Sequence, residues 1–405
     1  MEKQKNIPHL RFPEFEKEWD AMTLGNIAMF SKGKGLSKCD ISENGVTECI
    51  RYGELYTTYN ETINTAISKT NINPDELVLS ETNDIIIPAS GETHIDIAKA
   101  SCVLKSGVAL GGDLNIIRTP NNGVFLSYYL NSSKKQEIAQ LAQGISVVHL
   151  YAGQLSKLRL NLPTFPEQQK IASFFTAIDK KISQLKQKKT LLEHYKKGVM
   201  QKIFSQQIRF KDDNGQEYPK WEKITLGSFL IQKIREVPKP NSPYLAIGVR
   251  SHCKGTFQRV NSDPDKIEMD KLFVIKKDDL VVNITFAWEG AIALAKEEDE
   301  GGLVSHRFPT YIFNEDKVLG IYFQYVFIQK NFRELLDLIS PGGAGRNRVL
   351  NKKDFLKLTC NIPKVKEQTK IANFLTAIDD KINHTQKQIE KTEIWKKGLM
   401  QQMFV

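Results

Sequence analysis

The segment from 163 to 204, PTFPEQQKIASFFTAIDKKISQLKQKKTLLEHYKKGVMQKIF, occurs twice in the chain. The second copy, PKVKEQTKIANFLTAIDDKINHTQKQIEKTEIWKKGLMQQMF, runs from 363 to 404, at an offset of 200 residues and without a gap. Both copies keep Glu-Gln, Thr-Ala-Ile-Asp, Lys-Lys-Gly and Met-Gln at matching places, and roughly half of the aligned positions are identical. A repeat of this length indicates a duplicated architecture.

Each copy has the apolar spacing of a long amphipathic helix. Alternating steps of four and three residues from Ile171 and from Ile371 place mainly apolar side chains on one helix face, which is the stripe of a coiled coil. A proline precedes each predicted helix, and about 38 residues at 1.5 Å each would span roughly 57 Å. Polar residues interrupt both stripes, so we expect the two helices to pair with each other as an antiparallel coiled coil. The alternative is two ordinary core helices of two duplicated domains.

The composition is typical of a globular chain with an anionic partner. The 405 residues include 40% hydrophobic side chains and carry a formal net charge of +10, which suits two or three domains and, most often, a nucleic-acid ligand. The five cysteines are scattered, with no Cys-x-x-Cys pair for zinc. The sequence shows neither a signal peptide nor an apolar run of membrane-spanning length. We therefore expect a cytoplasmic protein with reduced thiols and no membrane partner.

The duplication extends beyond the helices. Trp19 is followed by Thr-Leu-Gly, and Trp221 is followed by Thr-Leu-Gly at the same spacing. We predict four parts in chain order: a first globular domain over 1–162, a central repeat helix over 163–205, a second globular domain with a polar linker over 206–362, and a C-terminal repeat helix over 363–405. We expect the first 18 residues to be a loosely ordered lead-in.

Both globular parts show the same order of predicted elements, which indicates a mixed α/β (α+β) fold with an internal pseudo-two-fold repeat. Short β-branched runs bounded by turn residues predict strands, at 48–52, 84–88, 100–104, 114–117 and 158–162 in the first part, and at 244–249, 280–284, 291–294 and 308–313 in the second. Helical periodicity predicts one further helix in each part, at 124–142 and at 318–339.

Motifs for catalysis are missing from the sequence. It contains no phosphate-binding G-x-x-x-x-G-K-[ST], no G-x-G-x-x-G, no H-E-x-x-H and no G-x-S-x-G. The Asn/Asp-Pro-Pro-Tyr/Phe motif of amino-methyltransferases is absent as well. Pro-Asp pairs at 74–75 and 264–265 could each begin a nuclease triad, but such pairs are more often turns. We assign no catalytic residue and no metal ligand.

A glycine-rich turn over 340–350, SPGGAGRNRVL, carries the strongest binding signal. Glycines permit close backbone approach, and arginine suits bidentate contacts with phosphate or guanine, so Arg346, Asn347 and Arg348 are candidate DNA contacts. The matching turn in the first part, 144–150, has His149 and no arginine. A loop that only caps a helix is the alternative for both turns.

Other candidate DNA contacts lie on loops between predicted strands, where recognition residues usually occur. Each of them alone is also consistent with a solvated loop. They are Lys32, Lys34, Arg51, Tyr52, Thr93, His94, Arg250, Lys254, Trp288, His306 and Arg307.

The chain resembles the specificity subunit of type I restriction–modification enzymes, the HsdS family. The resemblance rests on LPTFPEQQKI at 162–171 with Ala-Ile-Asp at 177–179, and on IPKVKEQTKI at 362–371 with Ala-Ile-Asp at 377–379. The two Trp…Thr-Leu-Gly openings and the two glycine turns also fit, so the resemblance covers the whole chain. The doubled pattern at a fixed offset is far more specific than one such motif.

The resemblance implies two target-recognition domains, each reading one half of a bipartite, asymmetric site in double-stranded DNA. It implies that the coiled-coil helices separate these domains, fix the gap between the half-sites and dock two modification (M) subunits. The chain itself would be no enzyme and would bind no cofactor. The M subunits would use S-adenosylmethionine to methylate adenine N6, and restriction (R) subunits would use ATP and Mg for translocation and cleavage.

The ends of the repeat helices supply candidate residues for docking these subunits, with simple helix termination as the alternative: Lys196, Lys197, Phe204, Lys396, Lys397 and Phe404. Two other functions remain open. An atypical DNA-modifying enzyme with an unrecognised site would methylate or cut DNA on its own. A coiled-coil interaction scaffold would lack the salt-dependent DNA binding that a DNA-reading protein must show.

Overall fold

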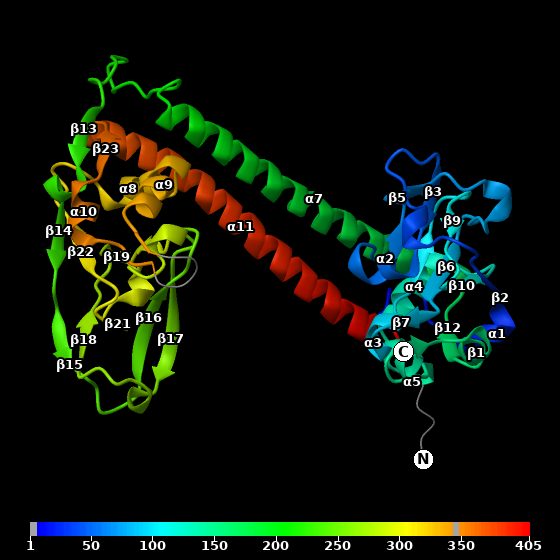
Figure 1. The fold of residues 1–405 in the computed structure, drawn as a ribbon. Coiled ribbons are helices and arrows are strands. Elements are labelled where there is room, and N and C mark those ends of the chain that lie inside the picture. The colour runs from blue at the N-terminus through cyan, green and yellow to red at the C-terminus, as the bar shows by residue number, and fades with distance from the viewer. Residues whose placement is uncertain (1–5, 343–347) are drawn as a thin grey trace. The chain divides into compact units, whose positions relative to one another are not determined.

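A computed structural model describes residues 6–342 and 348–405 of the chain (Figure 1). It divides into two compact units: unit 1 contains the chain up to Thr190 together with His384–Val405, and unit 2 is Leu191–Asn383. The boundary falls inside both repeat helices, α7 (Phe165–Phe204) and α11 (Val365–Met403). Each globular domain is therefore completed by the start of one repeat helix and the end of the other.

Unit 1 is built on a five-stranded sheet in the order β2-β10-β6-β8-β4. All neighbours are antiparallel except β4 and β8, which are parallel. A three-stranded sheet, β5-β3-β9, and two strand pairs, β1-β12 and β7-β11, complete it. The strands are β1 (Asp20–Thr23), β2 (Met29–Lys32), β3 (Thr47–Ile50), β4 (Thr62–Ile63), β5 (Ser68–Thr70), β6 (Asp84–Pro88), β7 (Ser90–Gly91), β8 (Ser101–Val103), β9 (Ala109–Leu110), β10 (Leu114–Arg118), β11 (Val148–His149) and β12 (Arg159–Leu162).

The central strand β6 shows why this sheet forms. Three consecutive isoleucines alternate between the two faces of a strand. Ile85 and Ile87 join the core that contains the helix α4 (Gly123–Asn131), whereas Ile86 joins a second core with Ile50 and Leu110 of the small sheet. All residues of β6 are buried, as expected for a strand that is covered on both faces. The other helices of unit 1 are α1 (Leu24–Ile27), α2 (Tyr52–Thr57), α3 (His94–Ile97), α5 (Lys135–Leu141) and α6 (Ala152–Leu155).

Unit 2 repeats this plan with a four-stranded sheet, β14-β22-β19-β20, and a five-stranded sheet, β15-β18-β21-β16-β17. In β19, Leu280 and Val282 face the helices and Val281 faces the second sheet. The strands are β13 (Glu222–Thr225), β14 (Leu230–Lys233), β15 (Glu236–Pro238), β16 (Tyr244–Val249), β17 (Thr256–Ser262), β18 (Lys271–Val274), β19 (Leu280–Val282), β20 (Ile292–Leu294), β21 (Leu303–Val304), β22 (Thr310–Phe313) and β23 (Thr359–Ile362). The helices are α8 (Gly320–Phe327), α9 (Lys330–Leu338) and α10 (Lys352–Lys357).

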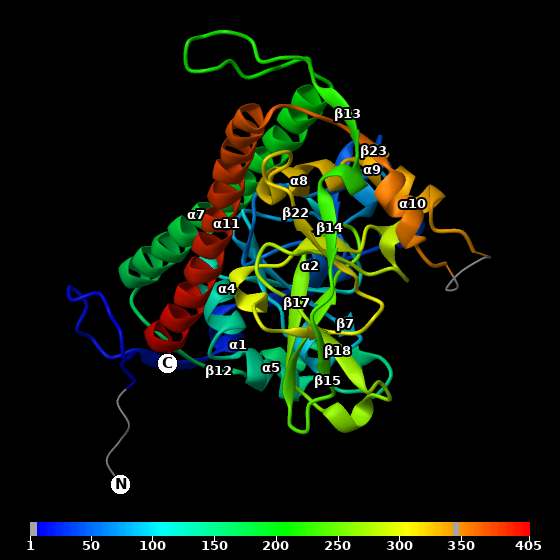
Figure 2. The same cartoon turned by 90° about the vertical axis from the view of Figure 1, so that its left-hand side faces the viewer.

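The structure confirms the predicted strands and corrects several bounds. The strands predicted at 84–88 and 244–249 are β6 and β16. The strand predicted at 48–52 ends at Ile50, because Arg51 caps the helix α2. The helices predicted at 124–142 and 318–339 are each divided into two helices, α4 with α5 and α8 with α9. The division occurs because Ser132 and Gln329 leave the helical backbone conformation. The second strand of the hairpin β16–β17 was not predicted. Figure 1 shows the two strands side by side, and Figure 2 shows β17 from another side.

Two polar segments are more ordered than the sequence suggested. In the N-terminal lead-in, Arg11 Nε and Nη2 donate to the two carboxylate oxygens of Glu167, at 2.7 and 2.8 Å. Trp19 Nε1 donates to the same carboxylate at 3.3 Å. The linker of unit 2 repeats this arrangement around the buried Glu367, with Arg209 at 3.2 and 2.7 Å and an indole N–H at 3.2 Å. A buried carboxylate requires such paired donors, which explains why both helices carry a glutamate in their first turn.

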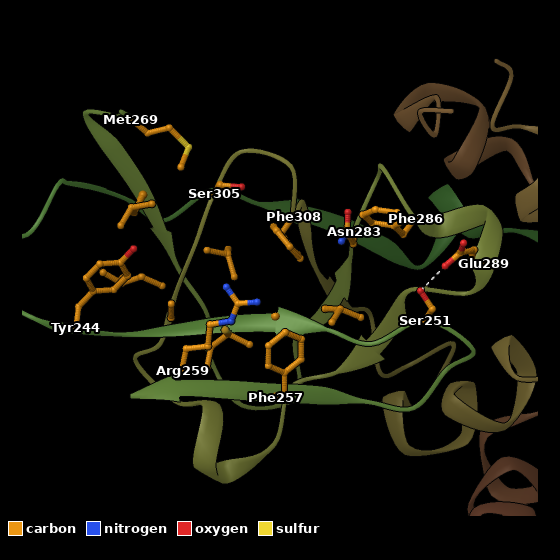
Figure 3. A pocket seen from close by; sticks show the side chains of 17 residues that line it. Tyr244, Ser251, Phe257, Arg259, Met269, Asn283, Phe286, Glu289, Ser305 and Phe308 are labelled. Atoms are coloured by element: carbon orange, nitrogen blue, oxygen red, sulfur yellow. Dashed lines mark hydrogen bonds between the residues drawn. The ribbon is translucent and has the colours of Figure 1, made fainter. Parts of the chain in front are cut away.

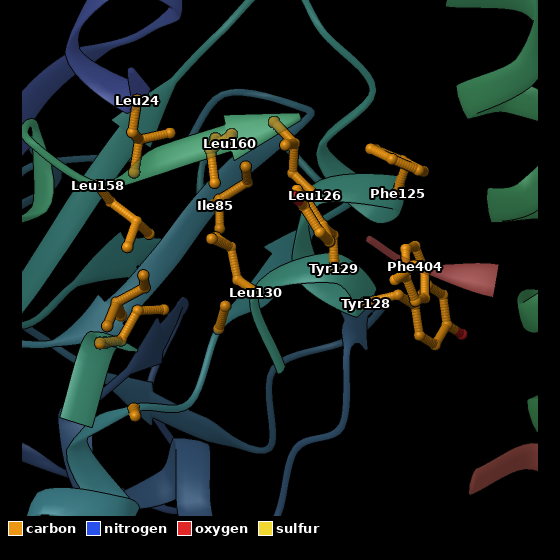
Figure 4. Packing of buried hydrophobic residues seen from close by; sticks show 14 of the residues in the cluster. Leu24, Ile85, Phe125, Leu126, Tyr128, Tyr129, Leu130, Leu158, Leu160 and Phe404 are labelled. Carbon is orange, nitrogen blue, oxygen red and sulfur yellow. The ribbon is translucent and has the colours of Figure 1, made fainter. Parts of the chain in front are cut away.

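The two repeat helices pack against each other in an antiparallel sense within unit 1. Phe175 of α7 stacks on Phe404 of α11, with ring centroids 5.6 Å apart. Further along α7, Lys186 forms an ion pair with Glu393 at 2.7 Å. Glu393 lies earlier in α11 than Phe404 does. Residue numbers therefore increase along α7 in the direction in which they decrease along α11, so the two helices are antiparallel. Figure 4 shows Phe404 against Tyr128 and Phe125 in the core of unit 1.

A lysine of one repeat pairs with the aspartate of the other repeat in both units. In unit 1, Lys396 lies 2.7 Å from Asp179 and also reaches Glu61 at 2.9 Å. In unit 2, Lys196 lies 2.6 Å from Asp379. A tyrosine hydroxyl donates to each aspartate, from Tyr128 at 2.5 Å and from Tyr325 at 2.9 Å. The repeated Asp and Lys thus hold each domain against both helices.

Candidate nucleic-acid interfaces

Exposed side chains of unit 1 gather beyond one end of its five-stranded sheet. Lys32 ends β2, and its ammonium lies 5.9 Å from the ring centroid of Tyr151. His149 stacks beside Tyr151 with ring centroids 6.2 Å apart. The pairing of β11 with β7 places His149 opposite Ser90. A cation from one chain segment and an imidazole and an aromatic ring from another therefore lie together, which suits contacts with phosphates and bases.

Thr93 and His94 follow β7 on the same side of the domain. The Thr93 hydroxyl oxygen accepts from the backbone N–H of Asp96 at 3.1 Å and its hydroxyl donates to the Asp96 carboxylate at 2.6 Å. Thr93 therefore acts as the cap of α3, while His94 is exposed.

A second cluster in unit 1 surrounds an open cleft of about 820 Å³. Arg51 donates from Nε and Nη2 to one oxygen of the buried Glu54, at 3.1 and 3.0 Å. Together with Tyr52 and Lys38 it lines the cleft. Lys34 is exposed on the extension of β2. The position before it must be glycine, because a Cβ on Gly33 would lie 2.0 Å from a backbone oxygen.

In unit 2, several candidate residues surround a cavity of about 440 Å³ (Figure 3). Ser251 donates to the Glu289 carboxylate across its edge at 2.6 Å. The candidates Arg250, Lys254, His306 and Arg307 are exposed on the segments that carry the lining residues Ser251, Ser305 and Phe308.

The aromatic platform of this cavity was missed from the sequence. The guanidinium carbons of Arg250 and Arg259 lie 5.1 and 5.3 Å from the ring centroid of Phe257. The signal was available, because Phe257 and Arg259 are two residues apart on a strand and so share a face. Tyr151 of unit 1 was missed as well.

In unit 2, Arg348 at the end of the glycine-rich segment is held by contacts within the domain. Arg348 stacks on Trp288, with the guanidinium carbon 5.0 Å from the ring centroid. Its Nε and Nη2 donate to the backbone oxygens of Ser340 and Asp337 at 3.0 and 2.8 Å, and it forms an ion pair with the Asp337 carboxylate at 2.7 Å. Most of its donors are therefore occupied inside the domain. Arg346 and Asn347 lie outside the described residues.

Both glycine turns return to the same place in their domains. The N–H of Leu150 donates to Ala89 O at 2.9 Å, and the N–H of Leu350 donates to Ile284 O at 2.8 Å. Each acceptor lies just beyond the central strand of its sheet, β6 or β19. Leu150 and Leu350 therefore lie beside the loops that follow these two strands.

Most of the docking candidates on the repeat helices have partners inside the chain. Lys196 and Lys396 are engaged in the ion pairs described above. Phe404 is buried, and Phe204 packs against Trp221 and Tyr322 with centroids 6.1 Å away. The structure thus gives these four residues an intramolecular role. Lys197 and Lys397 are exposed.

Two features bear on chemistry and membranes. Across the 6–342 and 348–405 ranges, no group of three or more His, Cys, Asp or Glu side chains is arranged to hold a metal ion. Within the same part of the chain, no helix has the length and apolar character needed to cross a membrane.

Two domains of one plan, each held by both repeat helices and each carrying its own loop surface, define a duplicated DNA-recognition protein. The chain belongs to the family described as type I restriction modification DNA specificity domain, which matches residues 16–194 and 220–393. This membership confirms the predicted family, the mixed α/β fold with two domains linked by long helices, and the function as a DNA specificity subunit of type I restriction–modification systems.

Individual relatives agree with this assignment. The chain is 24% identical to the type I restriction enzyme MjaVIII specificity subunit of Methanocaldococcus jannaschii over 98% of this chain and 93% of that protein. The crystal structure of the type I restriction–modification S subunit from M. genitalium has the same fold, with a TM-score of 0.62 and 16% identity over 98% of this chain and 99% of that one. A structure described in terms of complex assembly and conformational transition of the type I R-M system matches with a TM-score of 0.52 and 14% identity, covering 96% and 97% of the two chains.

Proposed function

We propose that each unit binds one half of a bipartite duplex DNA site, and that the chain is the non-catalytic subunit of a cytoplasmic complex. The observation that carries this proposal is a repeated frame with different surfaces. The Arg–Glu–Trp and Lys–Asp–Tyr contacts recur in both units. The loop surfaces differ, with Lys32 and His149 in unit 1 and Phe257 and Arg259 in unit 2.

The physical argument separates affinity from sequence choice. Lysines and arginines at the loop surfaces neutralise phosphates and position the domain, whereas contacts with base edges select the sequence. Two different loop surfaces therefore read two different half-sites, and an asymmetric site follows. The same frame presented twice suits two copies of one partner.

We propose two modification subunits as these partners, docked on the exposed helix faces beside the paired lysines. Tyr195 and Trp395 occupy matching repeat positions and are each 53% exposed. Lys197 and Lys397 lie two residues further along and therefore point to another side of each helix. A large aromatic side chain left half-exposed on a helix is typical of an interface hot spot.

Docking at these faces is testable by stoichiometry. We expect Trp395→Ala and Tyr195→Ala each to remove one modification subunit, and the double variant to remove both, as measured by native mass spectrometry of the assembled complex. Phe165→Ala, which changes an exposed ring at the other end of α7, is the control. Two retained modification subunits in the double variant would contradict the proposal.

The partner subunits, and not the specificity chain, would catalyse methylation and cleavage. We propose that modification subunits use S-adenosylmethionine to methylate adenine N6, and that restriction subunits use ATP and Mg²⁺ to translocate and cleave DNA. The specificity chain would then choose the site and hold no cofactor.

The experiment that tests the function is methylome sequencing of the host with the gene present and deleted. We expect one bipartite methylated motif to vanish on deletion. Loss of no motif, together with the lack of salt-dependent DNA binding by the assembled complex, would favour an interaction scaffold. Methylation by the purified chain alone would favour the atypical enzyme.

A further inference from the structure

We propose that the cavity of unit 2 receives a single unstacked nucleobase from the half-site that this unit binds. The inference rests on the proposed DNA-binding function and adds a site to it. Its ligand is an adenine or cytosine ring turned out of the duplex.

The shape of the cavity favours a whole ring. Its volume of about 440 Å³ lies within the range of roughly 300–1,000 Å³ for small-molecule sites. Apolar side chains of the five-stranded sheet line it, among them Ile247, Val249 and Val304. A base inside a duplex offers only its edge to a protein. Walls on several sides, as Figure 3 shows, therefore suit a base that has left the stack.

Phe257 provides a stacking surface that the backbone has made room for. It lies opposite Gly248 in the hairpin β16–β17. A Cβ on Gly248 would come within 2.2 Å of the ring, so the ring lies flat over the strand only because residue 248 is glycine. Phe286 and Phe308 line the same cavity. Aromatic faces of this kind hold bases by stacking.

The polar end of the cavity supplies one donor and one acceptor. Asn283 is only 9% exposed, and its Oδ1 accepts from the N–H of Thr285 at 3.1 Å. This contact fixes the amide orientation, and Nδ2 has no hydrogen-bond partner among the residues that the structure describes. Glu289 uses one oxygen to accept from Ser251 and keeps the other for a ligand.

The chemical types of these two groups, an amide donor and a carboxylate acceptor, suit the hydrogen-bonding edges of adenine and cytosine. Both bases present an amino donor next to a ring-nitrogen acceptor. A carboxylate accepts from the amino group, and an amide N–H₂ donates to the ring nitrogen. Purely apolar walls would suit a thymine methyl group or an aliphatic side chain equally well. The amide N–H₂ group, which makes no hydrogen bond with the described residues, is what favours a base over an apolar ligand.

Cations around the cavity can hold the flanking phosphates. Arg259 and Arg307 are exposed, and Lys254 lies in the turn between β16 and β17. The backbone oxygen of Arg307 accepts from Ile284 N–H at 3.0 Å, which ties its loop to the segment that carries Asn283.

The test uses the assembled complex with modification subunits and the duplex site that methylome sequencing defines. Each position of the second half-site is replaced in turn by 2-aminopurine or pyrrolocytosine, and a fluorescence rise on binding reports an unstacked base. In parallel, an abasic site is placed opposite each position, which removes the cost of breaking the pair. We expect both signals at one position that is not a methylated adenine, with severalfold tighter binding to the abasic duplex.

Variants then assign the position to the cavity. Phe257→Ala and Asn283→Ala should remove both signals and weaken binding by at least tenfold, while Tyr151→Ala in unit 1 should weaken binding and leave the signals intact. Thermal unfolding of each complex identifies a variant that fails to fold. The fluorescence scan of the wild-type complex tests the inference even if a variant does not fold.

Three results would overturn the inference. Site-specific binding by the wild-type complex without any signal outside the methylated adenines would remove the nucleobase and leave the proposed function standing. A signal that persists in both cavity variants would place the extruded base in a partner subunit. Absence of site-specific binding altogether would instead remove the proposed function, on which the inference rests.

Discussion

Individual side chains explain why the repeated residues recur. The aspartates at 179 and 379 do not mark a catalytic site; each accepts from a tyrosine hydroxyl and pairs with a lysine of the other repeat. The lysine ammonium also lies over the same tyrosine ring, 5.1 Å from the centroid of Tyr128 and 5.2 Å from that of Tyr325. A partly buried lysine with these partners contributes more than an exposed ion pair.

This cluster predicts unequal effects of the same substitution in the two units. Lys396→Met removes the paired ammonium group from two carboxylates, Asp179 and Glu61. Lys196→Met removes it from Asp379 alone. We expect Lys396→Met to lower the free energy of unfolding by about 1.5–3 kcal/mol and Lys196→Met to lower it by less. Urea denaturation of both variants measures this. Equal losses would contradict the role of Glu61.

Glu61 also predicts a pH dependence. Burial is the largest single effect and acts to raise its pKa, but the charge and hydrogen bond of Lys396, together with the charge of Lys99, outweigh burial, so that the pKa is lowered. For Lys396, burial acts to lower the pKa, and Glu61 and Asp179 outweigh it, so that this pKa is raised. A lowered acid pKa stabilises above the unfolded value of about 4.3, and a raised lysine pKa stabilises below about 10.4.

The stabilisation by Glu61 is therefore present at neutral pH and is lost as the pH falls through its folded-state pKa. Glu61→Gln should lower stability at pH 7 and make the loss between about pH 5 and 3 shallower than in the wild type. Melting temperatures across this range measure it. Glu16→Gln, which changes an exposed carboxylate of the same unit, serves as the control, and an unchanged slope in Glu61→Gln would refute the prediction.

At the scale of elements, the hairpin β16–β17 joins a backbone feature to a site. The ring of Phe257 lies over the strand at Gly248, so the glycine determines where the aromatic platform lies. The sequence alone predicted β16 but not its partner, because β17 is polar and mostly exposed or half-buried. Its pairing depends on the neighbouring strand rather than on its own apolar pattern.

Gly248→Ala should therefore act through Phe257. We expect a loss of about 1–3 kcal/mol in the free energy of unfolding, since a Cβ at this position overlaps the ring. Phe257→Leu in the same chain should recover part of the loss, and the double-mutant cycle measures the coupling. Gly153→Ala, where a Cβ would meet nothing within 4 Å, is the matched control. Strict additivity of the two changes would exclude the proposed contact.

On the scale of the whole molecule, the unit boundary inside both repeat helices is the main feature. Neither domain is completed by its own repeat alone, because α7 begins in unit 1 and ends in unit 2, and α11 runs the other way. The helices therefore do two things at once. They complete both hydrophobic cores, and they connect the two recognition domains.

Helix length then predicts the gap of the recognised site. Deletion of one heptad from the middle of both helices removes about 10 Å of each, which corresponds to about three base pairs. We expect the methylated motif to keep both half-sites and to lose that many positions between them. Sequencing of the methylome with the shortened gene measures the gap. Deletion from α7 alone should disrupt the packing of α7 against α11 and abolish methylation. An unchanged gap after deletion from both helices would contradict the prediction.

The sequence by itself determined the long helices, the strands with apolar β-branched runs and the family. These follow from periodicities and repeats that are local in the chain, such as the isoleucines of β6 and the apolar steps from Ile171. The tertiary structure alone decided that Lys396 meets Asp179, that Arg11 and Arg209 clamp the glutamates of the repeats, and that Asn283 and Phe257 share a cavity. Such contacts join segments far apart in the sequence. They depend on how whole elements pack, which no local pattern records.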